Sequence, residues 1–285
     1  MSAKIISLIN NKGGVGKTTS TGVIAELLSY LGAKVLCVDI DQQSNLSMMF
    51  NCYVEDSDAV IDGIEPPAEN NVAELFKYRY RNADDVRSII RKTPIRNLDI
   101  IPSSKRHKRT QLNINANETG NNNIILKKAL NTVHNDYDYI LIDNAPASDV
   151  LTVNSMFASD YVLTPVRVEA FSYKGLKETL DSIAYIKEEH DLENCNFLGA
   201  FITQAELNTN IYKDLNKQYQ QELGAKFLKT PIRKDIKISE VETVFVPLLE
   251  YCSTANAIFD YANLILELNI LTDHEQSLLK KAMGI

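Results

Sequence analysis

The residues best suited to chemistry are the glycines, lysines and threonines of the segment NNKGGVGKTTS, residues 10–20. This segment directly follows the mainly apolar run 5–9, so a strand would pass through a glycine-rich turn into a helix. Such a turn directs backbone N–H groups and the positive end of the helix at one spot, where an oxyanion can bind. We therefore predict that the segment binds a nucleoside triphosphate.

The segment fits the phosphate-loop pattern GxxxxGK[ST] at Gly16, Lys17 and Thr18. In that pattern the glycine allows close backbone approach, the lysine reaches the β and γ phosphates, and the threonine ligates Mg²⁺. Asn11 replaces the first glycine of the pattern, and the chain adds a second lysine, Lys12. We interpret Lys12 as part of the phosphate site rather than as a solvated loop lysine.

Two acidic segments follow the phosphate-binding segment along the chain. CVDIDQQSN, residues 37–45, carries Asp39 and Asp41, which strand alternation places on the same side. DYDYILIDNAPAS, residues 136–148, carries Asp143 directly after an apolar run, the Walker B arrangement. A carboxylate beside a triphosphate is repelled unless Mg²⁺ or water lies between them, so these aspartates are candidates for holding Mg²⁺ and positioning water. The alternative for Asp39 and Asp41 is that they belong to a surface turn.

The elements that must position these motifs are short β-branched runs that alternate with segments of helical period, which is typical of βαβ units. We expect strands at 4–9, 34–38, 98–101, 139–142, 161–165 and 196–203, and helices at 17–31, 124–134, 172–190, 210–222 and 254–269. The predicted fold class is α/β, a doubly wound, mostly parallel sheet flanked by helices. Ligands of such sheets bind at the carboxyl ends of the strands, where all three motifs would meet.

Composition favours one domain over residues 1–285, with surface excursions near 51–97 and 105–123 and a helical tail at 254–285. A chain of 285 residues that is 45% hydrophobic can bury a full core. The chain has no apolar run of the roughly 18 residues that span a bilayer and no signal-peptide pattern, so a cytoplasmic protein is expected.

The net charge bears on nucleic-acid binding, and the spacing of the cysteines bears on their redox state. The net charge of −7 argues against a surface that is basic all over, although a local basic patch can still bind nucleic acid. The four cysteines are far apart and form no CxxC pair, so we interpret them as reduced thiols.

Taken together, the three motifs resemble those of the ParA/Soj partition ATPases, within the deviant Walker A group of P-loop NTPases that includes MinD and the nitrogenase iron protein. KGGVGKTT is the hallmark of that group. VDIDQQSN is similar to the family's DxDPQGN, with Gln42 in place of proline and Ser44 in place of glycine. The resemblance extends to LDIIPSS at 98–104, YILIDNAPA at 139–147, VLTPVRVEAFSYKGL at 162–176 and IRKDIKISE at 232–240.

The resemblance implies the cofactors ATP and Mg²⁺ and a role for each motif. Lys17 would bind the phosphates of its own nucleotide, and Lys12 those of a partner subunit, offsetting the repulsion between two apposed triphosphates. Asp41 would orient the attacking water, so Lys12, Lys17 and Asp41 are the implied catalytic residues. Thr18, Asp39 and Asp143 would hold Mg²⁺. The implied nucleotide contacts are Lys12, Gly13, Gly14, Val15, Gly16, Lys17, Thr18 and Thr19, with Gln204 and Pro231 at the adenine.

The family resemblance also implies partners. An ATP-bound homodimer would bind DNA without sequence preference, and a ParB-type centromere-binding protein would stimulate hydrolysis. With no helix-turn-helix ahead of the first strand, the chain resembles the small form of the family. Intrinsic hydrolysis is expected to be weak, because no arginine finger can be identified in the sequence. The protein would associate with the nucleoid, and no membrane partner is expected.

The implied DNA-binding residues are basic side chains late in the chain: Arg233, Lys234, Lys237, Lys213 and Lys217. Glu206, Leu207 and Asn208 stand where the family often has an arginine-containing DxRTN pattern, and Lys237 stands where an arginine is usual. The cluster could therefore be a solvated face. The run KRHKR at 105–109 is an alternative DNA surface or a partner contact.

Two other functions share the phosphate-binding segment. A MinD-like membrane-cycling ATPase would end in a basic amphipathic helix, for which residues 274–285 are the candidate. An iron-protein-like reductase needs cluster-binding cysteines, but Cys195 and Cys252 lie outside the segments that carry them in that family.

Overall fold

The computed structural model describes residues 2–54, 71–77, 82–104, 110, 114, 122–146, 149–169 and 172–284. Within them the strands form one sheet in the order β3-β4-β2-β5-β1-β6-β7. The strands are β1 (Lys4–Leu8), β2 (Val35–Asp39), β3 (Arg91–Lys92), β4 (Leu98–Ile101), β5 (Tyr139–Asp143), β6 (Tyr161–Arg167) and β7 (Asn196–Thr203). All neighbours are parallel except β3, which is antiparallel to β4. The predicted fold class is confirmed.

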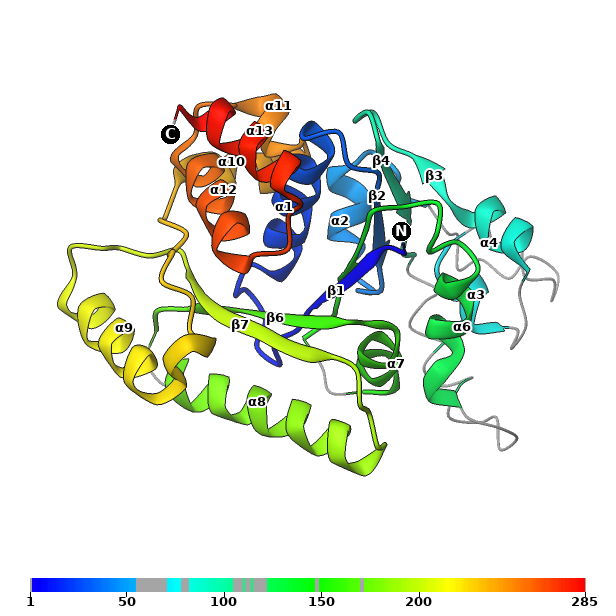
Figure 1. Ribbon diagram of the computed structural model, residues 1–285, viewed down its shortest axis with the longest axis horizontal. Coiled ribbons are helices and arrows are strands. Elements are labelled where there is room, and N and C mark those ends of the chain that lie inside the picture. The colour runs from blue at the N-terminus through cyan, green and yellow to red at the C-terminus, as the bar shows by residue number, and fades with distance from the viewer. Residues whose placement is uncertain are drawn as a thin grey trace, which may run out of the picture.

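Helices cover both faces of the sheet. They are α1 (Lys17–Tyr30), α2 (Asn45–Met49), α3 (Ala73–Lys77), α4 (Ala83–Ile89), α6 (Ile125–Asn131), α7 (Val150–Ala158), α8 (Ser172–Glu189), α9 (Asn210–Leu223), α10 (Ile236–Val244), α11 (Leu248–Tyr251), α12 (Asn256–Leu268) and α13 (Asp273–Met283). α1 and α12 lie on one side and α7 and α8 on the other (Figure 1). Each face has its own apolar core, so the strands between them are almost wholly buried.

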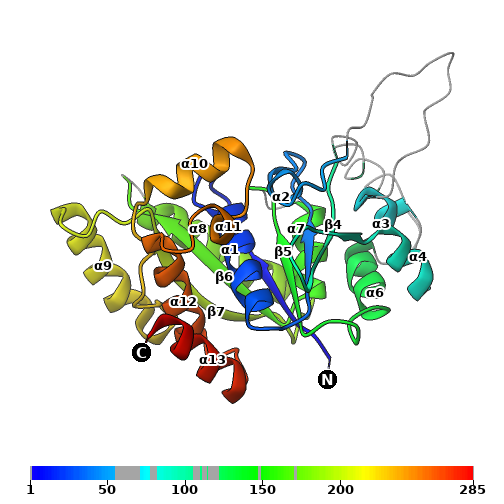
Figure 2. The ribbon, with the colours of Figure 1, turned by 90° about the horizontal axis from the view of Figure 1, so that it is seen from above.

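Strand register brings the three motifs to one edge. β1 lies beside β5 with Leu8 opposite Asp143, and β2 lies on the other side of β5 with Asp39 opposite the same residue. The chain therefore leaves β1, β2 and β5 at the same edge of the sheet. α2 and α10 lie toward this edge as well (Figure 2).

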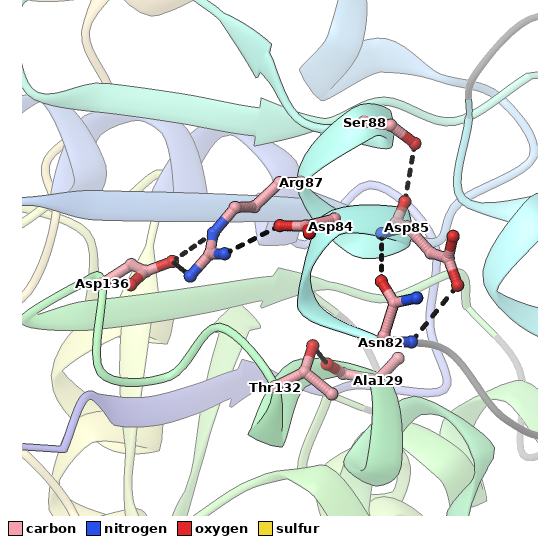
Figure 3. Close-up of polar contacts among 8 residues, drawn as sticks. All are labelled: Asn82, Asp84, Asp85, Arg87, Ser88, Ala129, Thr132 and Asp136. Atoms are coloured by element: carbon pink, nitrogen blue, oxygen red, sulfur yellow. Dashed lines mark hydrogen bonds and ion pairs between the residues drawn. The ribbon is translucent and has the colours of Figure 1, made fainter.

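Part of the expected surface excursion 51–97 is folded against the sheet as α3, α4 and β3. Asn82 and Asp85 form a capping box at the start of α4, with N···O distances of 2.9 and 3.2 Å (Figure 3). Arg87 then donates to Asp136, 3.0 Å away, and to Asp84 at 3.2 Å (Figure 3). Capping and ion pairs thus fix a helix too short for its periodicity to be recognised. The run 105–109 and residues 55–70 lie outside the described residues.

A buried carboxylate joins α1 to α11. Glu26 is 1% exposed, and its two oxygens accept hydrogen bonds from the backbone N–H groups of Leu248 (3.1 Å) and Leu249 (2.7 Å). These are N–H groups at the start of α11, which have no partner within that helix. Burial raises the pKa of Glu26 to about 7.

This shift predicts a pH dependence of stability. The folded chain holds the Glu26 proton more tightly than the unfolded chain, whose pKa is 4.5, so the free energy of unfolding should fall between pH 4.5 and about 7. The fall is on the order of 3 kcal/mol. Urea titrations at pH 5 and pH 7.5 should show that Glu26→Gln loses stability less steeply than the wild type. Identical pH dependence in the two proteins would contradict the assignment.

Candidate nucleotide-binding site

The phosphate loop, residues 9–16, joins β1 to α1. Gly14 and Gly16 have φ of +70° and +84°, a left-handed conformation that glycine adopts without strain. The hydroxyl of Thr203, the last residue of β7, donates to the Val15 carbonyl at 2.8 Å. The loop is therefore set both by its glycines and by a neighbouring strand.

Lys17 lies inside this loop. Its ammonium donates to the carbonyl oxygens of Asn10 (3.0 Å) and Lys12 (2.9 Å), and the residue is 6% exposed. Burial lowers the pKa of Lys17, and the charges of Asp143 and Asp41 oppose that shift. The carbonyl contacts hold the charge at the centre of the loop, where a phosphate can replace them as its partner.

A cavity of about 580 Å³ lies over the loop, within the size range of small-molecule sites. The predicted residues that line it are Gly13, Gly14, Gly16, Lys17, Thr18, Thr19, Asp41 and Gln204. Other residues that line the cavity were not predicted from the sequence: Gln43, Asn45, Met49, Pro146, Arg167, Val241, Glu242 and Phe245. Among these, Glu242 of α10 accepts a hydrogen bond from the Thr19 hydroxyl.

Other predicted contacts lie outside the cavity. Val15 is buried and contributes only its backbone to the loop. Pro231 borders a separate depression, together with Arg233 and Asp260. The structure therefore brings Gln204, but not Pro231, to the cavity where the adenine is expected.

The three predicted aspartates have different surroundings. Asp41 lines the cavity, is 8% exposed, and accepts a hydrogen bond from the Gln43 N–H at 2.9 Å. Asp39 is fully buried and accepts from the Ser47 N–H (2.9 Å), the Ser47 hydroxyl (2.6 Å) and the Asp41 N–H (3.1 Å). Only Asp41 is thus placed to touch a ligand directly.

Asp143 has unused hydrogen-bonding capacity. It is fully buried, and its Oδ2 has no hydrogen-bond partner in the described part of the chain. Burial and the charge of Asp39 raise the pKa of Asp143, while the Thr18 hydroxyl and Lys17 act in the opposite direction. A cation near Asp143 and Asp39 would stabilise the negative charges of their buried carboxylates.

These observations fit a Mg²⁺ site made largely by the nucleotide. Thr18 lines the cavity, and the free oxygen of Asp143 is available to a water molecule of the metal. In the described residues no group of three or more His, Cys, Asp or Glu side chains could hold a metal alone. Most ligands would therefore be phosphate oxygens and water, as is usual for Mg²⁺. Both oxygens of Asp39 already accept hydrogen bonds within the chain.

Lys12 does not line this cavity. The aliphatic part of its side chain lies against Gly175 of α8. A Cβ atom added at that glycine would lie only 3.3 Å from the Lys12 Cδ. Its ammonium is 3.7 Å from Glu169, and the side chain is 40% exposed. The second lysine of the motif thus points out of its own phosphate loop toward solvent beside α8.

Two of the predicted DNA-binding residues, Arg233 and Lys234, are held in ion pairs. Arg233 binds Asp260 through Nε (2.9 Å) and Nη2 (2.8 Å), an Asp that also accepts from the Arg233 backbone N–H. Lys234 is 2.6 Å from Glu206. Arg233 therefore ties its segment to α12, which is a structural role.

Three other predicted DNA contacts remain on the surface. Lys237 pairs with Glu240 at 2.7 Å and lies 5.5 Å from the centre of the Tyr251 ring. Lys213 and Lys217 are exposed on α9, one turn apart. The five predicted basic residues therefore do not form one uniform patch.

Similarity to known proteins agrees with this site. The family described as "AAA domain" matches residues 3–196. The sporulation initiation inhibitor protein Soj of Bacillus subtilis is 31% identical over 248 residues, which cover 87% of this chain and 91% of that protein. The chain belongs to the ParA/MinD family of P-loop ATPases. The chromosome-partitioning ATPase Soj of Treponema pallidum is another family relative, 28% identical over 93% of this chain and 96% of its own.

Solved structures of other proteins have the same fold. A putative plasmid partition protein of Borrelia burgdorferi bound to AMPPNP has a TM-score of 0.73 and 26% identity, covering 93% of this chain and 98% of that one. An ATP complex of McdA from Cyanothece has a TM-score of 0.78 with 21% identity, covering 95% and 98%. At that identity the second likeness shows the fold alone.

Proposed function

We propose that this ParA/MinD family member is a partition ATPase that binds Mg-ATP and dimerises around two nucleotides. The observation that carries the proposal is the cavity over the phosphate loop, which has Lys17 at its base and Asp41 in its wall. The Borrelia burgdorferi relative was solved with the triphosphate analogue AMPPNP, which supports a triphosphate ligand here. ATP hydrolysis to ADP and phosphate is the reaction.

Asp41 is the residue we assign to water positioning. The Gln43 N–H holds one of its oxygens, and the side chain lines the cavity, where it can accept a hydrogen bond from a water molecule. Orienting the attacking water is one part of catalysing this reaction. Intrinsic turnover is expected to be weak, and a ParB-type centromere-binding protein would raise it.

Lys12 is the residue we assign to the partner's nucleotide. Its 3.7 Å distance to Glu169 exceeds the roughly 2.7–2.9 Å of a charge-assisted hydrogen bond, so the ammonium is loosely held. It is also outside its own cavity and half exposed. A loosely held, outward cation can reach a triphosphate across a dimer interface, where it offsets repulsion between the two nucleotides.

The ATP-bound dimer would bind DNA without sequence preference, and hydrolysis would release it. Lys213 and Lys217 are the strongest candidates for phosphate contact, because Lys237 and Lys234 already have carboxylate partners. Binding through lysines and DNA phosphates is strongly salt-dependent. The protein would be cytoplasmic and associated with the nucleoid, and its cargo would be a plasmid or chromosome.

Replacing both lysines of α9 should test this DNA surface. Lys213→Ala/Lys217→Ala should weaken binding of the ATP-bound dimer to DNA and reduce the slope of log K against log salt by about 2. Lys237→Ala should reduce it less, because Glu240 already neutralises that charge. Hydrolysis without DNA should not change in any of these variants. An unchanged slope in the double variant would move the footprint elsewhere, first to residues 105–109.

A MinD-like membrane cycle is the alternative function. The described residues contain no helix that is both long and apolar enough to cross a bilayer. α13, which covers most of the candidate membrane segment, buries Leu279 in the core, and Met283 packs against the same core. Leu278 of the same helix is exposed. One exposed leucine is a small apolar surface for lipid, which favours the partition function.

One paired experiment separates the two functions. A DNA mobility shift and co-sedimentation with anionic liposomes are run on the same protein with Mg-ATP and with Mg-ADP. The proposal expects an ATP-dependent shift of DNA and no ATP-dependent recovery with liposomes. Liposome binding without a DNA shift would establish the alternative.

A further inference from the structure

A second cation lines the nucleotide cavity in addition to Lys17. Arg167 is the last residue of β6, and it lines the cavity together with Gly13, Gly14 and Lys17. Its strand partner in β7 is Thr203, whose hydroxyl holds the Val15 carbonyl. The backbone of Arg167 is therefore fixed beside the phosphate loop, although its side chain is 45% exposed.

Arg167 and Lys12 share a single counter-ion. The Nε of Arg167 is 3.5 Å from one oxygen of Glu169, and the ammonium of Lys12 is 3.7 Å from the other. Both distances exceed the roughly 2.7–2.9 Å of a charge-assisted hydrogen bond. One carboxylate thus faces two cations, and neither makes a short contact with it.

The neighbours of Arg167 favour the terminal phosphates. Its counter-ion Glu169 also contacts Lys12, so Arg167 lies beside the first residues of the phosphate loop. On that side Gly13 lies beside Pro146, which follows Asp143 closely in the chain. Another part of the cavity lining comes from Val241, Glu242 and Phe245 of the α10 region, which suit a nucleoside better than a phosphate.

We propose that Arg167 binds the terminal phosphates of the nucleotide held by its own subunit and stabilises the charge that develops there during hydrolysis. A guanidinium binds two phosphate oxygens at once, which a lysine cannot do. Arg167 acts in cis because it lines its own cavity, whereas Lys12 does not. When nucleotide binds, Arg167 leaves Glu169 and the pair is replaced by a phosphate contact. This inference rests on the proposed ATPase function.

The test compares Arg167→Ala with Arg167→Lys and with the control Arg96→Ala, an exposed arginine that borders other depressions. Binding of Mg-ATP and Mg-ADP is measured by calorimetry, and hydrolysis by single-turnover phosphate release. Arg167→Ala should bind ATP about 10-fold more weakly with little change for ADP, and hydrolyse it about 100-fold or more slowly. Arg167→Lys should recover part of the affinity, and Arg96→Ala should match the wild type.

The same measurement in a Lys12→Ala background decides between cis and trans action. If Arg167 acts in cis, Arg167→Ala should weaken ATP binding to the Lys12→Ala monomer by the same factor. Loss of the effect in that monomer would overturn the cis assignment. Equal affinities of wild type and Arg167→Ala for ATP would overturn the phosphate contact, whereas a wild type that binds neither nucleotide would instead refute the proposed function.

Discussion

Asp41→Ala is expected to hydrolyse ATP at least about 100-fold more slowly than the wild type, while it still binds Mg-ATP. Asp41 has one oxygen held by the Gln43 N–H and lines the cavity, so its loss removes the group that orients water. Lys17 and the loop glycines, which bind the phosphates, are untouched. The variant should therefore accumulate as an ATP-bound dimer that stays on DNA.

Phosphate release under single-turnover conditions measures this loss directly. Asp41→Asn, which keeps the size of the side chain and its acceptor for Gln43, should be almost as slow as the alanine variant, because the negative charge is missing. Glu242→Gln changes the other carboxylate of the wall and should retain turnover. Normal hydrolysis by Asp41→Ala would remove Asp41 from the reaction.

Lys12→Ala is expected to abolish ATP-induced dimerisation and to leave ATP binding by the monomer measurable. The Lys12 ammonium lies outside its own cavity, 3.7 Å from Glu169, so its removal leaves the cavity of the same subunit intact. Two apposed triphosphates would then repel each other without a cation between them. The defect should therefore appear only when two subunits meet.

Light scattering with size-exclusion chromatography, with and without Mg-ATP, distinguishes these states. Lys174→Ala is the matched control, because Lys174 borders the same depression as Lys12 but lies on α8 rather than in the phosphate loop. It should dimerise like the wild type. A Lys12→Ala protein that still dimerises with ATP would refute the trans role.

The sheet and the phosphate end of the site could be predicted because they depend on local pattern. Apolar runs such as 139–142 mark buried parallel strands, and the aspartates stand where these strands end. The rule that parallel strands end at one edge then brings Asp39 and Asp143 together, as their register shows. The conformation of the loop could also be predicted, because glycine is the residue that adopts a positive φ without strain.

The parts that could not be predicted depend on contacts between distant residues. Arg167 lies beyond the expected end of its strand, and only pairing with β7 extends β6 to that point. α10 buries only Val241, so its sequence has almost no amphipathic pattern to recognise. The family resemblance implies that Arg233 contacts DNA, whereas its partner Asp260, which belongs to α12, is distant in the sequence.

The central claim is that Mg-ATP, and not Mg-ADP, joins two copies of this chain. Sedimentation velocity of the wild-type protein with Mg-ATP, with Mg-ADP and without nucleotide tests it most directly. We predict a dimer with Mg-ATP and a monomer in the other two conditions. A protein that binds ATP yet sediments as a monomer in all three conditions, or as a dimer without nucleotide, would contradict the account.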